Sequence, residues 1–163
     1  RCNGSTSTTS GVTPHMAKHI YCHHHTEIEV PFFDVDVMQI VWHGHYVKYL
    51  EIARCALLDA IGYNYTVMLK HGHAWPVVKL DLKYVRPARF GQKIRVEMAV
   101  TEYESCLRID YILRDAESGT KLTQAHTTQV VQRLDNGEMQ FQTPENWQKA
   151  VRQFKGFTPL ANG

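Results

Sequence analysis

The stretch from Phe32 to Arg54 reads FFDVDVMQIVWHGHYVKYLEIAR and does most to decide the fold of this chain. Two acids, Asp34 and Asp36, stand at the end of an expected strand, and a short apolar segment follows them. From His45 to Ile61 the apolar residues recur every three or four positions, which predicts a long amphipathic helix ending before a glycine. Its expected buried stripe consists of Tyr46, Leu50, Ala53, Leu57 and Ala60.

Alternating apolar residues predict strands on both sides of this helix. One strand is expected before the helix, and four follow it with short connections: 26–32, 76–84, 94–101, 107–113 and 121–134. In the 76–84 strand we expect Val78, Leu80, Leu82 and Tyr84 to face one way. This order predicts an α+β fold, in which an antiparallel sheet of about five strands wraps around one long central helix.

A short C-terminal helix is expected to close the chain. Thr143 is typical of a cap, Pro144 of a first helical position and Glu145 of a first turn, and the helix should reach about Phe154.

Composition restricts the class of protein. With 163 residues, 44% apolar and 21% charged, residues 16–163 are expected to form one globular domain. A net charge of +2 argues against nucleic acid or an anionic membrane as the main partner, and no window approaches the roughly 18 apolar residues of a membrane span. Residues 1–15 are interpreted as a disordered leader or an expression remnant. Four dispersed cysteines indicate free thiols and a cytoplasmic location.

With these elements placed, the chain resembles the hotdog-fold acyl-CoA thioesterases of the 4-hydroxybenzoyl-CoA thioesterase and YbgC-like family. The resemblance extends over residues 27–131. Its matched residues are Asp34, Asp36, Ile40, Val41, Trp42, His43 and Tyr46, followed by the segments at 75–78 and 84–88. The sequence departs from the family at Gln39, where a glycine is usual, at His45, where asparagine is frequent, and at Gln92, where an acid is common.

The resemblance implies a site for thioester hydrolysis without a cofactor. Asp36 would be the catalytic carboxylate, acting either as the nucleophile or as a general base on water, and both roles stay open. A backbone N–H near His43 or Gly44, at the helix start, would polarise the thioester carbonyl. The acyl group would contact Trp42, His45, Tyr46, Val77 and Val78, while Arg86 and Arg89 would bind the CoA phosphates. The resemblance also implies a homodimer or homotetramer with sites between subunits.

Other interpretations of the same residues stay open. An Asp-x-Asp pair before a helix is more often a cap or turn device, and Asp34 in particular is expected to be structural. Glu51 either pairs with Arg54 or faces solvent. The histidine pairs and triplet match no metal-binding spacing, so a metal site is not favoured. The alternative functions are a non-catalytic acyl-CoA binding module and, less favoured, a hydratase or dehydratase on the same fold.

Overall fold

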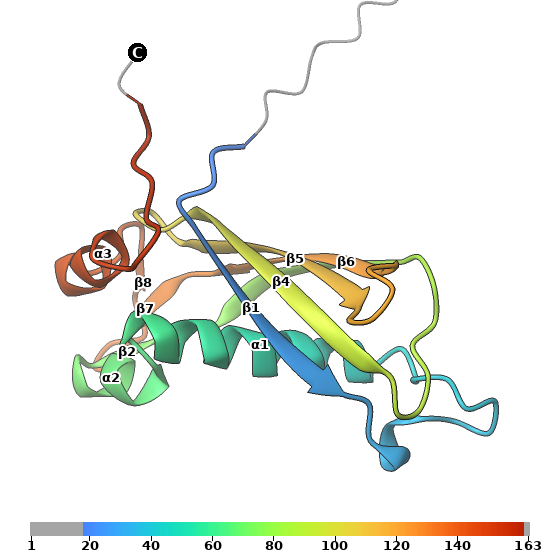
Figure 1. Cartoon of the computed structure of the whole chain (residues 1–163). Helices are drawn as coiled ribbons and strands as arrows, with labels where there is room; N and C mark the ends of the chain where they lie inside the picture. The colour runs from blue at the N-terminus through green and yellow to red at the C-terminus, as the bar shows by residue number, and fades with distance from the viewer. Residues whose placement is uncertain (1–17, 162–163) are drawn as a thin grey trace, which may run out of the picture.

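The computed structural model describes residues 18–161, and a five-stranded antiparallel sheet that curves over one long helix dominates this part of the chain (Figure 1). The sheet order is β1-β4-β5-β6-β3, and α1 spans His45–Ile61. The strands are β1 (Cys22–Glu29), β3 (Val77–Tyr84), β4 (Lys93–Glu102), β5 (Leu107–Asp115) and β6 (Lys121–Gln129). This arrangement confirms the predicted α+β hotdog fold. The predicted leader at 1–15 lies outside the described residues.

Helix α1 begins and ends at the predicted residues. Gly62 stops it in the left-handed conformation (φ 83°), from which its N–H donates to the carbonyls of Leu58 and Asp59. Four of the five stripe residues are buried, but Ala60 is exposed, because Leu58 and Ile61 carry the apolar face to the helix end. No helix within residues 18–161 is long and apolar enough to cross a membrane.

The central strands alternate as predicted. On β4 and β5 every second side chain is at most 2% exposed and belongs to the core beside α1: Ile94, Val96, Met98, Val100, Leu107, Ile109, Tyr111 and Leu113. Strand β1 differs from the predicted 26–32, because its pairing with β4 extends from Cys22 to Glu29 and the chain then turns at Pro31. Residues 32–34 form the short 3₁₀ helix η1 (Phe32–Asp34) instead.

Strand β3 forms one edge of the sheet, and most of its side chains are exposed. Val78, Leu80 and Tyr84 are exposed, and Leu82 alone in this strand is partly covered. The reason is the position of β3, which pairs with β6 on one side and, among residues 18–161, with no strand on the other. The edge therefore presents apolar side chains and unpaired backbone groups.

The end of the chain is more divided than predicted. The expected strand 121–134 splits into β6 and β7 (Val131–Arg133), which pairs with β2 (His73–Ala74) and β8 (Met139–Gln140) in a small separate sheet.

An unpredicted helix, α2 (Tyr65–Lys70), is capped by the Asn64 side chain, which accepts the N–H of Val67. Helix α3 spans Glu145–Arg152, one residue later than predicted, with Pro144 extended just before it. Thr143 caps nothing, because its hydroxyl donates to the backbone of Tyr103 and Glu104.

Candidate functional site

The loop before α1 is closed by its own backbone. Val35 and Val41 form an antiparallel bridge, and the Asp36 N–H donates to the Ile40 carbonyl at 2.9 Å. The Asp36 carboxylate then accepts the N–H groups of Met38 at 2.8 Å and Ile40 at 3.5 Å. Asp36 thus holds the tip of this loop, and in the single chain its side chain is exposed.

The tip of the loop carries unusual backbone geometry at Gln39. Its φ of 63° lies in the left-handed region, the only such non-glycine residue in the described part of the chain. Glycine is usual at this position in the resembled family, so the tight turn persists here although its preferred residue is absent.

Replacing Gln39 with glycine is expected to raise the free energy of unfolding by about 1 kcal/mol, because a left-handed conformation is strained for a residue with a Cβ. Gln39→Val should instead lower it, since a β-branched side chain tolerates this φ less well. Urea denaturation of the three proteins measures both changes. Equal stability of all three would contradict the assignment of strain to this residue.

The other acid, Asp34, makes the contact with the first turns of α1. Its carboxylate is 1% exposed and accepts the Lys48 ammonium at 2.6 and 2.7 Å and the Tyr49 hydroxyl at 2.7 Å. The His45 Nδ1 lies 3.6 Å away. Burial alone would raise the pKa of Asp34, but the hydrogen bonds from Lys48 and Tyr49 outweigh it and lower the pKa. Asp34 therefore anchors the loop to the helix, as its structural interpretation predicted.

Two backbone donors are free at the start of α1. The N–H groups of His45 and Tyr46 donate to the carbonyls of Trp42 and His43, whereas those of His43 and Gly44 have no acceptor among residues 18–161. The Trp42 ring lies against Gly44 so closely that a Cβ there would sit 2.1 Å from its Cζ3 atom. Unpartnered N–H groups at a helix start can stabilise negative charge on an oxygen.

A small cavity of about 160 Å³ lies between the start of α1 and the end of β3. The Tyr84 hydroxyl donates to the His43 carbonyl at 3.1 Å across it, and the buried Tyr46 hydroxyl accepts the Ala88 N–H at 3.0 Å. The lining residues are Ile40, Val41, His43, Tyr46, Tyr84, Val85, Arg86 and Pro87. Three predicted site residues, His43, Tyr46 and Arg86, are therefore brought together. Tyr46 is core as well as cavity wall.

The remaining predicted residues lie around this cavity without lining it. Asp36 points to its own loop, and Trp42, 59% exposed, packs edge-on against His45 with ring centroids 5.5 Å apart. Val77 and Val78 are exposed at the opposite end of β3, about 23 Å away along the strand. Arg89 is exposed in the following loop, where its N–H donates to Gln92.

Sequence reasoning missed two residues that shape the site. Lys48 and Tyr49 were both absent from the predicted stripe, yet both bind Asp34. Tyr49 follows Tyr46 by three residues, a helical spacing that could have placed it toward the same side. Nothing in the sequence pairs Lys48 with an acid fourteen residues earlier.

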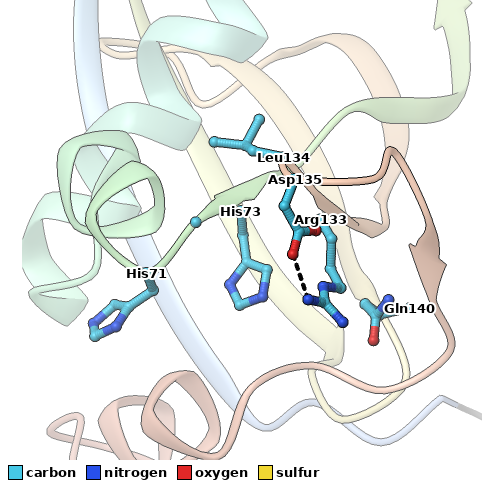
Figure 2. A pocket seen from close by; sticks show the side chains of 7 residues that line it. His71, His73, Arg133, Leu134, Asp135 and Gln140 are labelled. Carbon is cyan, nitrogen blue, oxygen red and sulfur yellow. Dashed lines mark hydrogen bonds and ion pairs between the residues drawn. The ribbon is translucent and has the colours of Figure 1, made fainter.

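A second hollow, of about 680 Å³, lies by the small sheet near the other end of α1 (Figure 2). It is lined by His71, Gly72, His73, Arg133, Leu134, Asp135 and Gln140, and Arg133 forms an ion pair with Asp135. Burial lowers the pKa of His73, whose Nδ1 is enclosed without a hydrogen-bond partner. No predicted site residue lines this hollow. Within the described part of the chain, no three His, Cys, Asp or Glu side chains are placed to hold a metal.

Comparison with known proteins adds independent information. Residues 30–153 match the model of the Thioesterase-like superfamily. A hypothetical protein from Thermus thermophilus is 30% identical with a TM-score of 0.72, over 80% of this chain and 98% of that one. A 1,4-dihydroxy-2-naphthoyl-CoA thioesterase from Synechocystis is 22% identical with a TM-score of 0.74, over 81% and 97%, and this likeness concerns the fold.

Among curated proteins, the chain is similar to YneP of Bacillus subtilis, whose name provisionally describes an acyl-CoA thioesterase. The two are 35% identical over 77 residues, which is 47% of this chain and 56% of YneP. The chain thus spans about half the length of the curated relatives that it matches, or less.

Proposed function

Because this chain belongs to the Thioesterase-like superfamily, we propose that it hydrolyses an acyl-CoA thioester to the free acid and CoA. The observation that carries the chemistry is the pair of unpartnered N–H groups of His43 and Gly44, beside the cavity at the helix start. A thioester carbonyl oxygen accepting these donors would be stabilised as it gains charge, which typically contributes about 3 to 4 kcal/mol per donor.

The carboxylate in this proposal is Asp36. It either attacks the carbonyl carbon, expelling CoA as the thiolate and leaving a mixed anhydride that water cleaves, or it takes a proton from the attacking water. Both routes give free acid and CoA and return Asp36 to its starting state. The Asp36 side chain would turn from its loop amides toward the substrate, and solvent exposure leaves it free to do so.

The proposed site is completed by a second copy of the chain. Five exposed apolar side chains surround Asp36 in the sequence: Phe32, Phe33, Val37, Met38 and Trp42. The open edge of β3 offers a pairing surface. Antiparallel self-pairing with Leu80 opposite its own counterpart would set Lys79 against Asp81, whereas a register centred on Asp81 would set Lys79 against Lys83. Charge therefore favours the Leu80-centred dimer.

Leu80→Glu is expected to convert the proposed dimer to a monomer and abolish turnover, because two like charges would meet at the centre of the pairing. Light scattering gives the mass and an acyl-CoA assay the activity. Leu134→Glu, at an exposed leucine outside the sheet, is the matched control and should change neither. A Leu80→Glu protein of wild-type mass would exclude this interface.

Trp42, His45, Tyr46, Val77 and Val78 are proposed to contact the acyl group. The exposed guanidinium groups of Arg86 and Arg89 are proposed to bind the CoA phosphates. Of the two, Arg86 is better placed for this role, since it lines the cavity at the helix start.

The test of the proposed function is release of free thiol from short, aromatic and long acyl-CoAs. Turnover of at least one substrate supports it, and absence of turnover with all of them contradicts it. One observation favours the second candidate, an acyl-CoA binding module: the Asp36 carboxylate hydrogen-bonds to its own loop. Tight binding of an acyl-CoA that stays intact would select this alternative.

A further inference from the structure

Arg54 is an isolated cation in the interior of the chain. In residues 18–161, Asp34 and Arg54 are the two buried charged side chains, at 1% and 6% exposure. Asp34 has Lys48 as its counter-ion, but no carboxylate of the described residues lies within 4 Å of the Arg54 guanidinium. The pairing with Glu51 considered from the sequence does not form. A buried guanidinium without an anion is costly, so its place in the core calls for an explanation.

The surroundings of Arg54 are polar, neutral and incompletely bonded. Its Nε donates to the Tyr65 hydroxyl at 2.9 Å, and the buried Tyr111 hydroxyl lies beside it. The same Tyr65 oxygen accepts the Gln129 amide at 3.2 Å. The Oε1 atom of Gln129 is enclosed without any donor, although this side chain is 1% exposed. The cluster therefore offers guanidinium donors and one unused acceptor to an oxygen-bearing group.

The position of Arg54 relates it to the proposed site. Gln129 pairs with Val77, which places the cluster at the start of β3, while the Tyr84–His43 contact places the start of α1 at the other end of that strand. Arg54 is nine residues after the first residue of α1, about 13 Å along the helix axis. Val47 and Glu51 precede it on the same helix face and are exposed.

We propose that Arg54 determines acyl specificity by binding a carboxylate or hydroxyl oxygen at the far end of the acyl group; this rests on the thioesterase function proposed above. A substrate whose thioester lies at the His43 and Gly44 amides would extend along the exposed helix face toward the guanidinium. A carboxylate accepts the two parallel N–H groups of an arginine fork, which makes a dicarboxylic acyl chain the best match.

The test compares kcat/KM for decanedioyl-CoA and dodecanedioyl-CoA, whose chains are long enough to span the distance from the start of α1 to Arg54, with values for decanoyl-CoA, dodecanoyl-CoA and omega-hydroxydodecanoyl-CoA. We expect the wild-type protein to prefer the oxygen-terminated chains, and the carboxylate and hydroxyl arms identify which terminus it takes. Arg54→Met should lower kcat/KM for the preferred chains by roughly 10- to 100-fold and leave the value for dodecanoyl-CoA within a few fold.

A second variant guards against misfolding as the cause. Gln129→Glu places a carboxylate inside the cluster, so it should pair with Arg54 and remove the preference while retaining activity on dodecanoyl-CoA. If the wild-type protein hydrolyses all five substrates alike and Arg54→Met changes nothing, the inference is overturned and the proposed function stands. If no acyl-CoA is hydrolysed, the proposed function itself fails.

Discussion

Replacing Asp36 with asparagine is expected to lower kcat for acyl-CoA hydrolysis by about 10²- to 10⁴-fold, whether the carboxylate is the nucleophile or the general base. The substitution keeps one side-chain oxygen, which can still accept the N–H groups of Met38 and Ile40. The loop and the melting temperature should therefore change little. Thiol release measured under saturating acyl-CoA, together with a thermal melt, separates loss of chemistry from loss of structure.

The matched control for this experiment is Glu27→Gln, which removes the charge of another exposed acid on the opposite edge strand, β1. Its kcat should equal that of the wild-type protein. An Asp36→Asn protein that keeps more than about a tenth of the wild-type kcat would assign Asp36 to loop closure alone, because a catalytic carboxylate contributes more than this factor.

Replacing Lys48 with methionine is expected to lower the free energy of unfolding by about 3 kcal/mol at neutral pH, because it leaves the Asp34 carboxylate buried without its counter-ion. Tyr49 alone would still donate to it. Urea denaturation measures the loss. Lys79→Met, which breaks an exposed pair with Asp81, is the control and should cost less than about 1 kcal/mol.

The pH dependence of this pair follows from the lowered pKa of Asp34. A carboxyl group whose folded pKa lies below its unfolded value of about 3.9 contributes stability at higher pH and loses it as pH falls through the folded pKa. In Lys48→Met the buried carboxylate has lost its cation and gains a proton more readily. The stability gap between the two proteins should thus narrow as pH falls below about 4. If the difference in free energy of unfolding between the two proteins stays constant down to pH 2, the difference arises from packing.

The elements that depend on local periodicity could be predicted from the sequence. The 3.6-residue period from His45 to Ile61 and the glycine after it determine α1, and strict alternation determines β4 and β5. Other features depend on the partner of each strand. The bounds of β1 follow from its pairing with β4, and the exposure of β3 follows from its place at the sheet edge. Neither is encoded in the strand itself.

The candidate site was predicted in part. The joining of His43, Tyr46 and Arg86 around one cavity could be anticipated, because the helix start and the end of β3 carry the resembled motif. The structural role of Asp34 was predicted, but its partners Lys48 and Tyr49 on α1 were not. Residues two apart on a regular extended segment point to the same side, but here Asp34 lies in a 3₁₀ turn and the two acids make different contacts. The charge of Arg54 gave no sign of burial.

The open edge of β3 also has a consequence for activity at low protein concentration. If turnover requires two chains to pair along this strand, the turnover rate per chain will depend on the protein concentration. By mass action, inactive monomers are favoured as the concentration falls. Assays at nanomolar protein should then show a lag that shortens as more protein is added. An excess of an inactive Asp36→Asn chain should likewise change the activity of the wild-type chain, because the two form mixed dimers.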